Sequence, residues 1–241
     1  MKTAQFIKMK KLLFTGIPVL LGLLSILPSC KKDYLIGGSI EDVNMYKGMT
    51  NYEVLSKDPA FDTLVQLIDA AGLKDQINQG GTTFFAPSDY AILNYMQQRT
   101  LYVQEHYNAN GIFGLDSLKY YLKNNIDNTR DSMLMYQINT PLPYDVLTRT
   151  GIAYQTGLSK DTAIVSYSPY GGTGPVSTQP RAVFYTHLWY HYDLSNSNRA
   201  EDIPEEIGVR TLVITSGINT KSGIMNYLEN FHILFFYGTK Q

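Results

Sequence analysis

Apolar side chains at helical spacing mark the first predicted helix of this chain, whose folded part begins near Asn51. One stripe at positions i, i+3, i+4 and i+7 is formed by Phe61, Leu64, Val65 and Ile68. Before it, Asp58 can accept a free backbone N–H, and Pro59 suits the first position of a helix. After it, Gly72 is a typical C-cap. The pattern therefore predicts a helix over residues 60–71.

A short strand and two further helices are predicted next. A turn leads into Thr82–Ala86, a β-rich run that Pro87 ends. Ser88 or Asp89 can then cap a second helix, which we expect to extend to about residue 98. A third helix is expected to begin at about residue 116, with apolar residues gathered on one side.

From residue 132 onward the pattern changes to strands. Short runs rich in β-branched and aromatic residues occupy positions 133–139, 151–155, 162–167, 182–192, 210–215 and 231–237. Residues 224–228 are expected to form a short helical turn before the last strand. Helices early in the chain and strands late predict an α+β domain, with the helices of the N-terminal half packed on a β-rich C-terminal half.

The N-terminus has the pattern of an export signal that is later removed. Residues 1–11 carry four lysines and no acid, residues 12–27 are almost wholly apolar, and small residues precede Cys30. The alternatives are an ordinary signal peptide or a membrane helix, but the run is shorter than the ~20 residues that span a bilayer. We therefore expect a signal peptide at 1–29, a tether at 30–50 and a folded domain at 51–241.

The end of this signal resembles a bacterial lipobox, which implies that Cys30 becomes a lipidated N-terminus. The charged tripeptide that follows, Lys31-Lys32-Asp33, resembles the surface-export signals of Bacteroidota lipoproteins. The resemblance implies a protein held in the outer membrane by lipid on Cys30 and facing the cell exterior. The membrane is then its first partner.

Composition narrows the classes of partner and of fold. The chain is 44% hydrophobic and 17% charged, which is typical of a globular protein. Without residues 1–29 it keeps 16 basic and 21 acidic residues, a formal charge of −5, so we expect no nucleic-acid partner. Cys30 is the single cysteine, so the exported fold has no internal disulfide.

Three segments resemble signatures of the fasciclin (FAS1) domain. Residues 82–91 (TTFFAPSDYA) are similar to the first signature, and residues 222–228 to the second, with Ser222 and Asn226 in place of Asn and His. Residues 118–126 lie where the family usually has a leucine-rich helix ending in Tyr-His, with Asn124 and Asn125 in place of that pair. The resemblance implies a single FAS1-like α+β domain from about residue 51 to residue 238, with insertions at 98–116 and 170–206.

What the resemblance implies for function is adhesion or another protein–protein interaction, without enzymatic activity. In Bacteroidota, such lipoproteins often accompany glycan-uptake systems, which suggests an outer-membrane transporter complex as a partner. The sequence also favours a lack of enzymatic activity, since it has no G-x-S-x-G motif and no evident nucleophile with a paired base. We therefore expect no catalytic residue and no cofactor.

The densest aromatic segment of the chain suggests an alternative, a surface glycan-binding protein. Its candidate ligand-binding residues are Tyr185, His187, Trp189, Tyr190 and His191, which would bind a surface polysaccharide. Ordinary half-buried strand residues would give the same pattern. If the segment is a strand, His187 and His191 lie about 13 Å apart at roughly 3.3 Å per residue, too far to share a metal ion. We therefore expect no metal site.

Overall fold

The computed structural model describes residues 45–169, 181–196 and 199–240. These residues all belong to one compact unit, Gly37–Gln241. The predicted signal peptide, Cys30 and the first part of the tether lie outside the described residues, so those predictions stay untested. Within the described ranges, no helix combines the length and the apolar character needed to cross a membrane.

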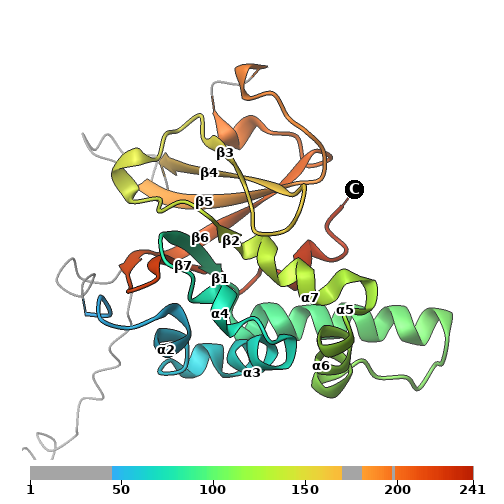
Figure 1. Cartoon of the computed structure of the whole chain (residues 1–241). Coiled ribbons are helices and arrows are strands. Elements are labelled where there is room, and N and C mark those ends of the chain that lie inside the picture. Colours follow the sequence, from blue (N-terminus) through green and yellow to red (C-terminus); the bar gives the residue numbers. More distant parts are fainter. Residues whose placement is uncertain (1–44, 170–180, 197–198, 241) are drawn as a thin grey trace, which may run out of the picture. The chain divides into compact units, whose positions relative to one another are not determined.

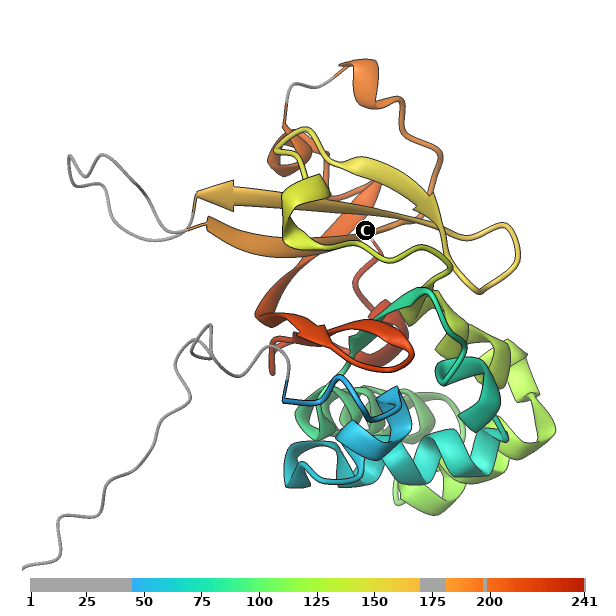
Figure 2. The same cartoon turned by 60° about the vertical axis from the view of Figure 1, so that its left-hand side comes forward.

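The helices come early in the chain and lie on one side of the domain (Figures 1 and 2). The α-helices in chain order are α2 (Asn51–Leu55), α3 (Asp62–Ala71), α4 (Lys74–Ile77), α5 (Asp89–His106), α6 (Leu115–Asn124) and α7 (Thr129–Ser132). The predicted stripe of α3 is confirmed, because Leu64 and Ile68 are fully buried and Gly72 ends the helix in the left-handed conformation.

The strands form one seven-stranded sheet in the order β2-β1-β7-β6-β5-β4-β3. They are β1 (Thr82–Ala86), β2 (Gln137–Ile138), β3 (Ile152–Gln155), β4 (Thr162–Pro169), β5 (Arg181–Leu188), β6 (Gly208–Asn219) and β7 (Gly223–Leu228). β1 and β7 pair in parallel, and all other neighbours are antiparallel. The predicted α+β class is confirmed, with helices in the N-terminal half and the sheet mostly in the C-terminal half.

Two predictions near the C-terminus were wrong. Residues 224–228, expected as a helical turn, belong to β7, which lies between β1 and β6. A strand flanked on both edges is an apolar run that periodicity cannot distinguish from a buried helix. The strand expected at 231–237 is absent, because Phe235 and Phe236 adopt left-handed φ angles of 61° and 52° that curl the chain.

Other boundaries also moved. Most of the strand expected at 133–139 is a 3-10 turn, Met133–Tyr136, followed by the short β2. The strand expected at 182–192 ends at Leu188, where the Trp189 and Tyr190 N–H groups turn to the carbonyl of Ile207. The second helix runs to His106 rather than to about residue 98, so α5 takes up part of the predicted insertion 98–116.

The cap of α5 differs from the prediction too. Ser88 is its N-cap residue, yet the Ser88 hydroxyl makes no capping hydrogen bond. The Asp89 carboxylate instead accepts the backbone N–H groups of Thr63 and Leu64, at 2.9–3.1 Å. These two donors belong to the first turn of α3, so Asp89 caps a neighbouring helix and joins it to α5.

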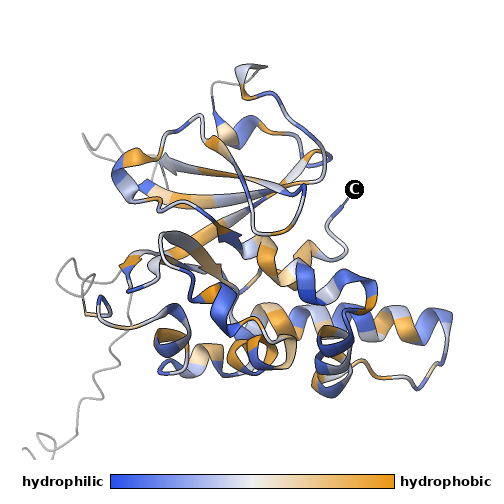
Figure 3. Ribbon diagram, in the orientation of Figure 1, coloured by the Kyte–Doolittle hydropathy of each residue, from blue (hydrophilic) through white to orange (hydrophobic). Residues whose placement is uncertain are grey.

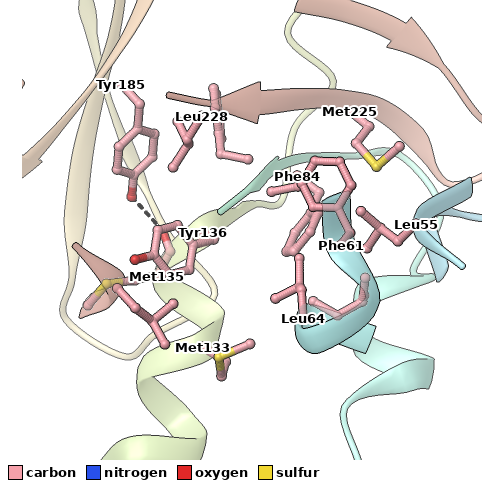
Figure 4. Packing of buried hydrophobic residues seen from close by; sticks show 14 of the residues in the cluster. Leu55, Phe61, Leu64, Phe84, Met133, Met135, Tyr136, Tyr185, Met225 and Leu228 are labelled. Carbon is pink, nitrogen blue, oxygen red and sulfur yellow. Dashed lines mark hydrogen bonds between the residues drawn. The ribbon is translucent and has the colours of Figure 1, made fainter. Parts of the chain in front are cut away.

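The main core lies between the helices and the sheet. Figure 4 shows Phe61 and Leu64 from the helical side meeting Phe84 of β1 and Met225 of β7. A smaller cluster on the other face of β4 and β5 contains Ile164, Leu188 and Ala200, with Tyr192, Leu194, Ile203 and Ile207 packed against it. Part of the predicted insertion 170–206 therefore covers the far face of the sheet.

Candidate functional site

Helix α5 exposes apolar side chains along the side that faces away from the core. Ala91, Ile92 and Tyr95 are buried against the domain, as in an ordinary core helix. Tyr90, Leu93 and Leu101 are exposed, and Leu101 keeps 61% of its surface. Figure 3 shows apolar positions alternating with polar ones along the ribbon of α5. A helix that is apolar on two faces, one of them in water, is typical of an interaction surface.

Beside this exposed face lies an apolar groove, which we name the α5 groove. Its volume is about 520 Å³, and it is lined by Leu93, Met96, Gln97, Thr100, Leu101, Ile112, Phe113 and Gly114. The second wall is the chain that returns from α5, held by hydrogen bonds from the Phe113 N–H to the Thr100 hydroxyl and from Gln104 to the Gly111 carbonyl. Ile112, on this wall, is 77% exposed.

A second hollow of about 670 Å³ lies against another side of α5, and we name it the Arg99 pocket. It is lined by Arg99, Tyr102, Val103, Tyr107, Tyr121, Asp127 and Tyr237. These residues come from α5, α6, the turn after α6 and the C-terminal segment, so only the folded domain assembles them. Each tyrosine is unremarkable in the sequence, and the helix that carries Arg99 and Tyr102 was expected to end before them.

The Arg99 guanidinium lies among aromatic rings. Its central carbon is 5.0 Å from the ring centre of Phe113, 5.5 Å from those of Tyr121 and Tyr237, and 5.8 Å from that of Tyr102. Within the described residues, Arg99 has no ion pair, and its buried Nε has no hydrogen-bond partner. Cation–π contact therefore replaces the usual carboxylate partner.

A buried polar cluster surrounds Phe236 and is closed to solvent. The Tyr136 hydroxyl lies 2.7 Å from His232 Nε2 and accepts the Phe235 N–H at 2.8 Å, so its own proton points to the imidazole. Burial, and secondarily the charge of His187, lowers the pKa of His232 to about 3. His187 stacks on Phe236 with ring centres 4.7 Å apart. The cluster is sealed, so it contributes to packing rather than to substrate chemistry.

The candidate ligand-binding residues in 185–191 do not share one exposed face. Tyr185 is fully buried and donates its hydroxyl proton to the Met135 carbonyl (Figure 4). His187 is buried too, with its Nδ1 3.4 Å from the Asp161 carboxylate. The reason is that β5 faces the main core on this side. Tyr185 and His187 are therefore not placed to bind a polysaccharide at the surface.

The other three candidates lie beyond the end of β5. Trp189 is half-buried, and its ring lies edge-on to that of His187 with centres 4.5 Å apart. Tyr190 is 55% exposed, but Lys240 Nζ lies 4.5 Å over its ring. His191 is exposed. Across the described ranges no three His, Cys, Asp or Glu side chains are placed to hold a metal ion.

The departures from the fasciclin signatures have structural roles. Asn125 ends α6 at a left-handed φ of 50°, and its side chain bonds to Asp131. The Ser222 hydroxyl accepts the Asn51 N–H and donates to the Asn78 carbonyl, which joins the start of the domain to its last hairpin. Asn226 accepts the Gly217 N–H at 2.9 Å. Polar side chains at these places hold backbone groups of the fold.

Comparisons with known proteins agree with the signatures in the first part of the domain. Residues 59–112 match the family model of the fasciclin domain, a range that includes α3, β1, α5 and Ile112 of the α5 groove. Among solved structures, the chain is similar to a FAS1 domain pair from the insect cell adhesion molecule fasciclin I, at 14% identity and a TM-score of 0.43. The match covers 74% of this chain and 46% of that one. No curated protein matches the chain.

Proposed function

We propose that this chain works by binding another protein, as an adhesion or interaction module, because residues 59–112 match the family model of the fasciclin domain. The observation that carries the proposal is the α5 groove. Its eight lining residues include no charged side chain, and Leu101 and Ile112 at its rim are mostly exposed to water. Such a surface is stabilised when a partner covers it.

The groove indicates what kind of partner it accepts. With no charge in its lining, it offers little to an ionic ligand, whereas the side chains of Leu93, Met96 and Leu101 offer apolar contact. Met adapts its shape to the group it contacts. The partner we propose is therefore a protein that inserts apolar side chains, and an outer-membrane transporter complex of a glycan-uptake system is our candidate.

The experiment compares two groove variants with a matched surface variant. Leu101→Glu and Ile112→Glu place a charge in the groove, while Ile214→Glu changes an equally apolar, half-exposed residue on β6. Full-length tagged protein is purified from detergent extracts of the producing bacterium, and the co-eluting transporter is quantified. We expect the groove variants to retain about a tenth or less of the transporter, and Ile214→Glu to retain it fully.

Two outcomes would contradict the proposal in different ways. If no transporter co-elutes with the wild-type protein, the partner is wrong. If the transporter co-elutes equally with Leu101→Glu, Ile112→Glu and the wild type, the α5 groove is not the contact surface. Circular dichroism of each variant checks that the fold is intact.

We also propose that lipid on Cys30 holds the domain at the outer membrane, facing the exterior. The support is the basic start, the apolar run and the small residues before Cys30. Cys30→Ala is expected to move the protein from the membrane fraction to the soluble fraction. Digestion of intact cells with a protease should remove the wild-type domain if it faces outward. Membrane association unchanged by Cys30→Ala would exclude the anchor.

A further inference from the structure

We propose that the Arg99 pocket is a saccharide-binding site, separate from the α5 groove and independent of the protein partner. Its volume of about 670 Å³ lies within the range of small-molecule sites, roughly 300–1,000 Å³. Aromatic rings and two charged groups line this pocket, in contrast to the uncharged α5 groove on the same helix.

The rings provide flat apolar surface that remains open to water. Tyr102, Tyr107, Tyr121 and Tyr237 all line the pocket, and Tyr107 is 77% exposed. An aromatic face packs well against the C–H face of a pyranose ring, while a tyrosine hydroxyl at the rim can hydrogen-bond to a sugar hydroxyl. Hydrogen bonding to Tyr107 raises the pKa of Tyr102, and a tyrosine hydroxyl is in any case protonated at neutral pH.

The charges indicate a ligand that both donates and accepts hydrogen bonds. Arg99 and Asp127 line the same pocket, and neither forms an ion pair within the described residues. An arginine can only donate and an ionised aspartate can only accept. Sugar hydroxyls satisfy both groups at once. An anionic ligand would be attracted to Arg99 but repelled by Asp127, so a neutral saccharide fits better.

The position of Asp127 is set by a strained turn. Asn125, Asp127 and Asn128 all have left-handed φ angles, of 50°, 54° and 56°. Asn and Asp adopt this region more readily than other residues with side chains, but it still costs free energy. The Asn125–Asp131 hydrogen bonds hold the turn, and Asp127 lies at the pocket as a result.

The two hollows beside α5 therefore differ in chemistry. The α5 groove presents Leu93, Met96 and Ile112, which suit apolar protein side chains. The Arg99 pocket presents hydroxyls and unpaired charges among rings. The sequence suggested glycan binding by residues 185–191, and the structure favours this other place, because two of those residues lie in the core.

The test uses affinity electrophoresis of the full-length protein in detergent, in native gels that contain xylan, galactomannan, dextran or mixed-linkage β-glucan. Polygalacturonate is included as an anionic probe. We expect at least one neutral polysaccharide to retard the wild-type protein. Isothermal titration with the matching hexasaccharide should show about tenfold weaker binding for Tyr107→Ala and for Asp127→Asn. Tyr107 is largely exposed, so its variant should fold normally.

Tyr190→Ala is the control, because Tyr190 is exposed and belongs to the segment that the sequence favoured. It should bind like the wild type. The proposal is overturned if no neutral polysaccharide retards the protein, if polygalacturonate alone binds, or if Tyr190→Ala abolishes binding while Tyr107→Ala does not. The groove variant Leu101→Glu should bind saccharide normally, so failure of the protein partner and failure of this site are separately visible.

Discussion

His232 should make the domain less stable in mild acid. Its ring is held neutral, since burial lowers the pKa of His232 to about 3 from an ordinary value of 6.5. In the unfolded chain the same side chain is exposed and takes up a proton below about pH 6.5. The unfolded state then binds more protons than the folded state. The free energy of unfolding therefore has its full value, as far as His232 is concerned, above pH 6.5, and it falls as the pH decreases toward 3.

The size of the effect follows from these two pKa values of His232. At pH 5 the unfolded state gains about 2 kcal/mol from protonation of this one group, and at pH 4 it gains about 3.3 kcal/mol. Tyr136 and His187 lie near the His232 ring, and Asp161 lies against His187. Burial also lowers the pKa of His187, against the opposing effect of Asp161, so His187 adds to the loss in the same direction.

The assay is urea unfolding followed by the fluorescence of Trp189, at pH 7.5 and at pH 5.0, for the wild type and for His232→Met. His232→Met leaves the Tyr136 hydroxyl without its acceptor, so its stability at pH 7.5 should be about 1–3 kcal/mol lower. The diagnostic quantity is the loss in the free energy of unfolding between pH 7.5 and pH 5.0. This loss should be about 2 kcal/mol smaller in the variant than in the wild type. An equal pH dependence in both proteins would refute a neutral, buried His232.

The remaining predictions concern backbone positions and are measured as changes in the free energy of unfolding in urea. Asp89→Ala should cost about 1–2 kcal/mol, because two backbone donors of α3 lose their acceptor, whereas Ser88→Ala should cost less than about 0.5 kcal/mol. Equal losses in the two variants would contradict the cap assigned to Asp89. Gly223→Ala should cost about 3 kcal/mol or more, because its Cβ would come within 2.0 Å of the Thr82 carbonyl oxygen at a φ of 137°. Gly80→Ala, with no atom near the added Cβ, should leave the free energy of unfolding almost unchanged. A similarly small loss in Gly223→Ala would show that β1 and β7 can move apart to accept the added Cβ.

The helical half of the fold could be predicted because its signals are local. The caps and stripe of α3 depend on residues within one segment, and Gly72 ends the helix as its position suggests. The strand order could not be predicted, because the pairing of β1 with β7 depends on residues far away in the chain. Residues 231–237 have the composition of a strand, but the left-handed turn at Phe235 and Phe236 places the Phe236 ring in the buried cluster instead.

The candidate site was less predictable than the fold. Aromatic density identified residues 185–191, yet a strand in the middle of a sheet uses such residues for packing, as Tyr185 and His187 do. The Arg99 pocket combines the end of α5 with single residues from three other segments, Tyr121, Asp127 and Tyr237, and none of these segments is unusual in composition. One signal was available for the α5 groove, since the apolar run Leu101-Tyr102-Val103 continues the helix past the polar residues 97–100.

The parallel pairing of β1 with β7 affects how the chain must be made. Thr82 pairs with Gly223, so an early strand finds its partner 141 residues later. Until that stretch has been synthesised, β1 has an open edge that other chains can add to. Closing this edge requires a contact of high sequence separation, which is typical of slow folding.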